Sequence, residues 1–223
     1  MANLPTSSNF DHGPCDLKHL VDEIQSGNAS LGDLMDAVRP RLLRMVNLRI
    51  SPQLNQRVDA EDIVQETFVT ASKRFDEYLS QPKVPVYVWF RGLAIERMID
   101  AMRFHLGAGK RSVNREEEAR HWVDQSTVNV LKKLPADQKT PSQVIADQQR
   151  SVELKNALQK LPDRYRDVLV LRFFETLTLS ETAATLEITE SNTKVLQFRA
   201  IKKLEQIITA DFNWQSEDRV GPS

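Results

Sequence analysis

Cysteine and clustered metal ligands are scarce in this sequence. Cys15 is the only cysteine among 223 residues, which excludes an internal disulfide and a zinc site built on several cysteines. The four histidines are scattered and show no HExxH spacing; they are His12, His19, His105 and His121. A glycine-rich phosphate loop and a nucleophile elbow are also missing. We therefore expect no metal, no cofactor and no enzymatic activity.

Long apolar runs and strand patterns are missing as well. No stretch approaches the roughly 20 apolar residues that a membrane-spanning helix needs. The N-terminus has neither the basic start nor the apolar core of a signal peptide. No segment alternates steadily between apolar and polar residues, and no Asn-Gly or Asp-Gly hairpin turn occurs. These absences predict an all-α protein that stays in the cytoplasm.

An excess of one charge is also absent, because the formal net charge is −1. A DNA-binding protein is often basic overall, so any nucleic-acid surface must arise here from local segregation of charge. Five basic residues stand against one acidic residue from Arg97 to Arg115, and four stand against one from Ser191 to Glu205. Basic patches of this kind bind phosphates by releasing counterions.

The two basic patches suit different forms of DNA. The first follows Trp89 and Phe90, which we expect to be partly core, and aromatic rings beside cations can hold the unstacked bases of a single strand. The second lies on a helix expected over residues 190–208. We therefore expect the first patch to bind melted DNA and the second to bind duplex DNA.

Helical periodicity dominates the chain. Helices are predicted over residues 17–24, 30–49, 86–104 and 164–175, with another starting near Asp59. Pro40 should kink or divide the second of these. Val64, Phe68, Ala71 and Phe75 form the expected core stripe of the helix after Asp59.

The C-terminal part has the pattern of a helix-turn-helix. Thr178 and Glu181 match a capping box, a short helix follows, Glu187 and the residue after it make the turn, and Thr189 can cap the basic helix. We expect two small helical domains joined by a flexible linker, the C-terminal one a helix-turn-helix. The expected segments are a tail at 1–16, a domain at 17–115, a linker at 116–141, a domain at 142–208 and a tail at 209–223.

Three segments together resemble the bacterial RNA polymerase sigma factors. The segment DAEDIVQETF at 59–68 is similar to their polymerase-binding helix. VWFRGLAIER at 88–97 looks like the helix that meets the start-proximal promoter element and helps to open it. LPDRYRDVLVLR at 161–172 and residues 178–204 resemble the domain that binds the upstream element. Two such domains without further ones point to the extracytoplasmic-function (ECF) class.

The resemblance assigns roles to individual residues. It implies that Asp62, Gln65 and Glu66 contact the clamp of core RNA polymerase. Binding of the start-proximal element and the melted strand falls to Trp89, Glu96, Arg97, Arg103, Lys110 and Arg111. Binding of the upstream element falls to Ser191, Asn192, Lys194, Val195, Arg199, Lys202 and Lys203. The implied partners are core polymerase and promoter DNA, and the class often has an anti-sigma factor as well.

Four positions depart from the usual family residues. Many relatives carry asparagine where this chain has Glu96, and glycine is frequent at the position of Glu187. Val195 and Leu196 replace polar or basic residues, so they either contact thymine methyl groups or pack inward. Phe198 is expected to pack rather than to read DNA.

A second function stays open at this point. The chain could be a stand-alone helix-turn-helix repressor or activator, which would use the second basic patch and leave the first one unexplained. Such a regulator would bind promoter DNA tightly without polymerase, as a dimer on paired half-sites.

Overall fold

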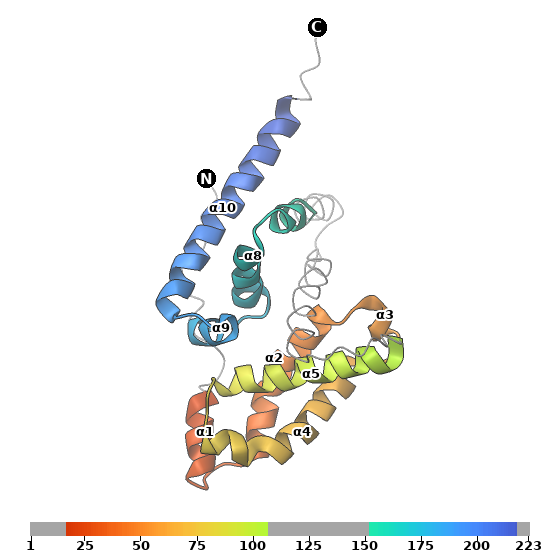
Figure 1. Ribbon diagram of the computed structural model, residues 1–223, viewed down its shortest axis with the longest axis vertical. Helices are drawn as coiled ribbons and strands as arrows, with labels where there is room; N and C mark the ends of the chain where they lie inside the picture. The colour runs from red at the N-terminus through yellow and green to blue at the C-terminus, as the bar shows by residue number, and fades with distance from the viewer. Residues whose placement is uncertain (1–16, 107–151, 218–223) are drawn as a thin grey trace, which may run out of the picture.

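The computed structural model describes residues 17–106 and 152–217 (Figure 1). The predicted tail at 1–16 and the linker at 116–141 lie outside them. The described residues hold no strand, in agreement with the predicted all-α class. The N-terminal domain, residues 17–106, contains α1 (Leu17–Gln25), α2 (Leu31–Arg49), α3 (Pro52–Asn55), α4 (Ala60–Ser80) and α5 (Val86–Leu106). The C-terminal domain, residues 152–217, contains a helix at 152–159, α8 (Asp163–Leu169), the π-helix η2 (Val170–Phe174), α9 (Leu179–Leu186) and α10 (Glu190–Glu217).

Helices α2, α4 and α5 pack on one another and form the core of the N-terminal domain. The stripe predicted for the helix after Asp59 is buried at every position: Val64, Phe68, Ala71 and Phe75. Asp59 caps α4 by accepting a hydrogen bond from the Glu61 amide. Ser30 caps α2 in the same manner within a capping box.

The predicted break at Pro40 does not divide α2, which runs as one helix from Leu31 to Arg49. Proline removes one backbone donor, and the carbonyl of Asp36 therefore loses its usual partner. Both Pro40 and Asp36 are exposed, so water can satisfy that carbonyl.

The helix-turn-helix forms as the sequence predicts. Thr178 and Glu181 make both hydrogen bonds of the capping box at the start of α9. Thr189 accepts a hydrogen bond from the Asn192 amide at 3.2 Å and so caps α10. Glu187, between the two helices, has φ 55° and ψ 41°, the left-handed conformation that glycine would adopt without strain.

Helix α10 is longer than predicted. It continues to Glu217, beyond the expected end near Ile208, so residues 209–217 of the predicted tail are helical. Neither glycine nor proline occurs between Glu190 and Gly221, and nothing in the sequence stops the helix earlier. Figure 1 shows the C-terminal half of α10 extending beyond α8 and α9.

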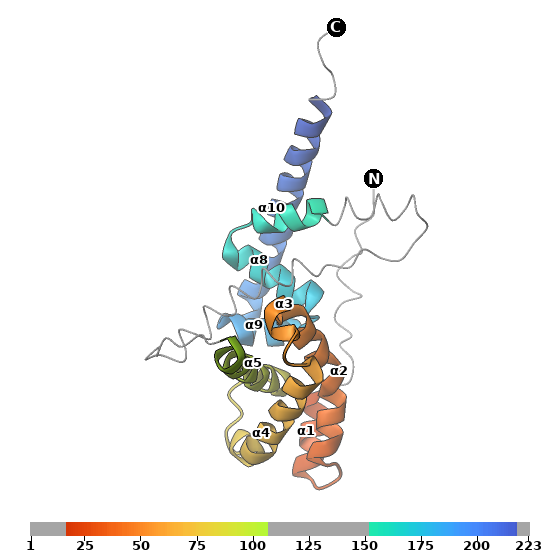
Figure 2. The same ribbon diagram turned by 90° about the vertical axis from the view of Figure 1, so that its right-hand side faces the viewer.

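The two domains touch each other, which the sequence did not predict. Helix α9 packs against α5, and Leu171 and Leu177 of the C-terminal domain join the core of the N-terminal domain. Figure 2 shows α9 beside α5 from a second direction. The closeness of the domains therefore depends on side-chain contacts and not only on their connection along the chain.

Candidate functional site

Helix α4 presents a polar face on the side opposite to its buried stripe. Asp62, Gln65 and Glu66 are all exposed, and their spacing of three and four residues places them side by side on the helix surface. Val69 lies one turn further along the same face, and 57% of its side chain is exposed. Sequence reasoning missed Val69, although its position seven residues after Asp62 could have indicated it. The face therefore combines three hydrogen-bond acceptor groups with one apolar side chain.

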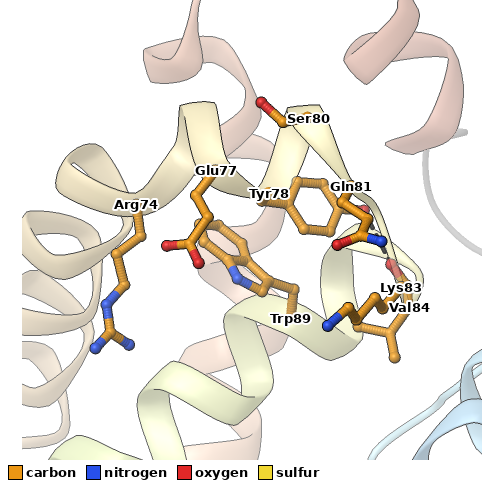
Figure 3. A pocket seen from close by; sticks show the side chains of 8 residues that line it. All are labelled: Arg74, Glu77, Tyr78, Ser80, Gln81, Lys83, Val84 and Trp89. Carbon is orange, nitrogen blue, oxygen red and sulfur yellow. Dashed lines mark hydrogen bonds between the residues drawn. The ribbon is translucent and has the colours of Figure 1, made fainter.

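A pocket of about 500 Å³ opens beside Trp89, where α4 ends and α5 begins (Figure 3). This volume lies within the range of about 300–1,000 Å³ that is usual for ligand sites. The lining side chains are those of Arg74, Glu77, Tyr78, Ser80, Gln81, Lys83, Val84 and Trp89. The pocket thus combines two aromatic rings with two cations, which is a suitable composition for a base and its phosphate.

The aromatic wall of the pocket is held rigidly. The rings of Trp89 and Tyr78 stack with centroids 4.8 Å apart, and Phe90 meets Trp89 edge-on at 5.0 Å. The Tyr78 hydroxyl donates to the carbonyl of Val84 at 3.0 Å and ties the loop between the helices to α4. Half-burial of Trp89 agrees with the expectation that it is partly core, while Phe90 is fully buried.

The pocket also contains cations that sequence reasoning missed. Arg74, on the last turns of α4, is half-exposed and lies 3.6 Å from the carboxylate of Glu96. Glu96 is therefore partly neutralised by a side chain from another helix. Lys83, in the loop, is exposed. No local pattern in the sequence marks either residue, because α4, the loop and α5 meet only in the folded chain.

The first basic patch is partly neutralised at the end of α5. Arg97 and Arg103 lie 2.9 Å and 3.5 Å from the carboxylate oxygens of Asp100. Phe104 on the same turns is strongly exposed. The predicted contacts Lys110 and Arg111, and Arg115 of the same patch, lie outside the described residues.

The predicted DNA-binding side chains of α10 all face solvent. These are Ser191, Asn192, Lys194, Val195, Arg199, Lys202 and Lys203. The inward side of α10 is formed by Thr193, Ala200 and the partly buried Leu196. Of the two alternatives for the apolar pair, Leu196 therefore packs inward, whereas Val195 is exposed and available to a ligand.

The prediction that Phe198 packs inward is wrong. Its side chain is 68% exposed, because it lies three residues after Val195 on the outward face of α10. Periodicity could have placed it there, since Leu196 and Ala200 already define the inward side. The recognition face is therefore basic with two apolar side chains, Val195 and Phe198.

Comparisons with known proteins agree with this arrangement of helices. The family model "Sigma-70 region 2" matches residues 34–105, and "Sigma-70, region 4" matches residues 157–206. The two matches together span more than half of the chain. The chain is 24% identical to the ECF RNA polymerase sigma factor SigD of Mycobacterium tuberculosis over 196 residues, which covers 87% of this chain and 84% of that protein. It is 28% identical to the ECF RNA polymerase sigma factor SigM of Bacillus subtilis over 158 residues, covering 69% and 82%.

This chain belongs to the ECF sigma factors of bacterial RNA polymerase. The polar face of α4 and the pocket beside Trp89 lie within the match to region 2, and the helix-turn-helix lies within the match to region 4. The alternative of a stand-alone helix-turn-helix regulator is not favoured, because region 2 would have no role in it. As a sigma factor, this chain acts in transcription initiation.

Over residues 17–106 and 152–217, no helix is both long and apolar enough to span a membrane. Nor do these ranges contain a cluster of three His, Cys, Asp or Glu side chains placed to hold a metal ion.

Proposed function

We propose that this sigma factor binds core RNA polymerase through the polar face of α4 and reads promoter DNA through α10 and the pocket beside Trp89. The observation that carries this proposal is that three faces of different chemistry are exposed at once on one chain. One is acidic and amide-bearing, one is an aromatic pocket with cations, and one is a basic helix. Each suits a different part of an initiation complex.

The α4 face suits docking on a basic protein surface. Its carboxylates and amide are positioned by a helix whose opposite side is buried, so few conformations are lost when they bind. Val69 adds an apolar contact beside these polar groups, and protein interfaces commonly combine apolar and polar side chains. We therefore assign Asp62, Gln65 and Glu66 to the polymerase clamp, with Val69 beside them.

The pocket beside Trp89 suits one unstacked base of the opened strand. A base stacked on an aromatic ring contributes about 1–3 kcal/mol to single-strand binding. Arg74 and Lys83 stand at the pocket to neutralise the adjoining phosphates, and Arg97 and Arg103 continue the cationic surface along α5. We propose that filling this pocket stabilises the melted start-proximal element.

The outward face of α10 suits the major groove of the upstream element. Lys194, Arg199, Lys202 and Lys203 would contact phosphates or base edges, while Val195 and Phe198 would contact thymine methyl groups. Ser191 and Asn192, in the first turn of α10, are free of the domain core and can donate or accept hydrogen bonds.

The sigma factor would supply promoter selection and strand opening, whereas polymerase performs the phosphoryl transfer. We accordingly propose that it is not an enzyme, needs no cofactor and works in the cytoplasm, where its polymerase is. An anti-sigma factor would be a further partner, one that prevents docking until it is removed.

Gel filtration with core RNA polymerase tests the docking proposal. The wild-type chain should co-elute with the core enzyme, and the triple variant Asp62→Ala/Gln65→Ala/Glu66→Ala should not. A matched control removes exposed groups of similar chemistry from α1 and α2, as Asp22→Ala/Gln25→Ala/Asp36→Ala, and should bind as wild type does. Equal binding by both triple variants would contradict the assignment of the α4 face.

A further inference from the structure

Five charged side chains join the two domains across a buried interface. From the N-terminal domain come Arg41 and Arg49 of α2 and Arg91 of α5, and from the C-terminal domain come Glu175 and Glu181. We call these five residues the latch. Their side chains are at most 9% exposed, although each type normally lies at the surface.

Glu175 is the centre of the latch. Its side chain is 0% exposed and follows η2, where it accepts a hydrogen bond from Arg49 Nε at 2.6 Å and another from Arg91 Nε at 2.8 Å. Burial alone would raise the pKa of the Glu175 carboxyl, but the two guanidinium groups more than offset this and hold its pKa below the ordinary value. One carboxylate thus pairs with two arginines from two different helices of the other domain.

The second pair of the latch involves Arg41, which lies earlier in α2 than Arg49. Arg41 donates to both carboxylate oxygens of Glu181, at 3.0 Å and 2.6 Å, and its guanidinium lies over the ring of Tyr87 at 3.6 Å. Glu181 is also the capping-box residue of α9, and it accepts a hydrogen bond from the Thr178 amide. This pair of the latch therefore binds α9, the first helix of the helix-turn-helix, to α2.

We propose that the latch holds the free sigma factor in a closed state, in which the helix-turn-helix domain is fastened to the N-terminal domain until core polymerase binds. The polar centre of the contact supports a reversible role. Domains separate readily unless the interface between them is large and apolar. Each of these charges is well hydrated when exposed, so opening recovers much of the free energy that is lost with the ion pairs.

In the closed state the polar face of α4 stays exposed, but the two DNA-binding elements are brought together. Asp62, Gln65 and Glu66 are exposed in it, so polymerase can bind the closed chain. Helix α9 packs on α5, which carries Trp89, and only the turn at 187–189 separates α9 from α10. A promoter offers its duplex and melted elements at separate places along the DNA, so the domains must part to bind both. This last step rests on the proposed function.

The connection along the chain is long enough for the domains to part. Residues 107–151 join them, and a segment of that length can span up to roughly 150 Å. The covalent connection therefore does not by itself prevent the domains from parting.

Pulsed electron paramagnetic resonance between two spin labels tests the latch. The labels are placed at Asp76→Cys on α4 and Gln206→Cys on α10, both exposed positions, in a Cys15→Ser background. The free wild-type chain should give one short, narrow distance distribution, and core polymerase should convert it to a longer one. The variant Glu175→Gln should give the longer, broader distribution without polymerase.

A charge-matched control and a second variant complete the design. Asp163→Asn removes one carboxylate from α8 at a site that is 82% exposed, and it should behave as wild type does. Arg41→Met breaks the other pair of the latch and serves if Glu175→Gln loses helix content by circular dichroism. If the closed state is favoured tenfold and polymerase completes its contacts only with the open chain, variants that open it should bind core polymerase up to about 10-fold more tightly.

The outcomes separate the latch from the proposed function. A free wild-type chain with the same broad distribution as Glu175→Gln would overturn the closed state. A polymerase complex that keeps the short distance would overturn the opening step. A labelled wild-type chain that forms no complex with polymerase would instead contradict the proposed function, and the free-chain distances would still decide whether the domains are latched.

Discussion

The substitution Glu175→Gln distinguishes a reversible latch from a permanent interface by its effect on thermal stability. The amide keeps the shape of the carboxylate but leaves Arg49 and Arg91 without their shared counter-charge. In a permanent interface the two arginines would stay buried with the Glu175 charge removed and only that of Asp167 acting on both, a change that costs up to about 3–5 kcal/mol. The two domains would then melt as one unit, and a unit of 150–250 residues loses about 2–4 °C in Tm per kcal/mol, so Tm would fall by roughly 6–20 °C.

A reversible latch predicts a much smaller loss. When the domains part, both arginines return to water, and the loss stops at the free energy of closing, about 1.4 kcal/mol for a tenfold preference. On the same scale of 2–4 °C per kcal/mol, scanning calorimetry of the free chain should then show a fall in Tm of no more than about 6 °C, with Asp163→Asn unchanged. A larger fall would refute the reasoning and show that the contact is part of one cooperative core.

Three other predictions concern the turn, the recognition helix and the pH dependence of the latch. Glu187→Gly should raise the Tm of the C-terminal domain by a few degrees, because a non-glycine residue in the left-handed conformation costs about 1–3 kcal/mol and glycine removes that strain at some cost in chain entropy; an unchanged or lower Tm would argue against it. Lys194→Ala should weaken promoter binding by the holoenzyme on every sequence and reduce the slope of log K against log salt by about 0.9, whereas Val195→Ala should change the preferred bases; fluorescence anisotropy at several salt concentrations measures both. The pKa of Glu175 is lowered in the closed state. The stabilisation that its carboxylate gives to the closed state is therefore complete above the ordinary pKa of about 4.3 and is lost as pH falls through the lowered value. The spin-label distance should therefore stay short from pH 8 to pH 5 and lengthen only below about pH 4. Opening near neutral pH would contradict the assignment of Glu175 as the centre of the latch.

Features that depend on local pattern could be predicted from the sequence. The buried stripe of α4, the capping box at Thr178 and Glu181 and the cap at Thr189 all depend on residues within a few positions of one another. Such patterns fix helix faces and helix starts, and for this reason the polar face of α4 and the position of the helix-turn-helix were both expected.

Features that depend on distant residues could not be predicted in this manner. The partners in the latch are 140, 126 and 84 residues apart in the sequence, and no periodicity links them. The sequence pattern marked Glu181 only as a capping-box residue and gave Glu175 no role, yet both are buried against arginines of the other domain. The pocket beside Trp89 could not be predicted for the same reason, because Arg74 and Trp89 come from two helices and Lys83 from the loop between them.

Errors at two positions of α10 have local causes. Phe198 is large and aromatic, but its register places it with Val195 on the outward face. Helix α10 passes the expected end near Ile208 because neither glycine nor proline occurs before Gly221 to stop it.

In vitro transcription of whole genomic DNA tests the central claim most directly. Core RNA polymerase is incubated with fragmented DNA of the source organism, with and without the purified chain, and the 5′ ends of the transcripts are sequenced. The account predicts start sites that appear only when the chain is present and that share an upstream and a start-proximal motif at fixed spacing. The absence of any new start site, with polymerase shown to be active alongside another sigma factor, would contradict the assignment of this chain to transcription initiation.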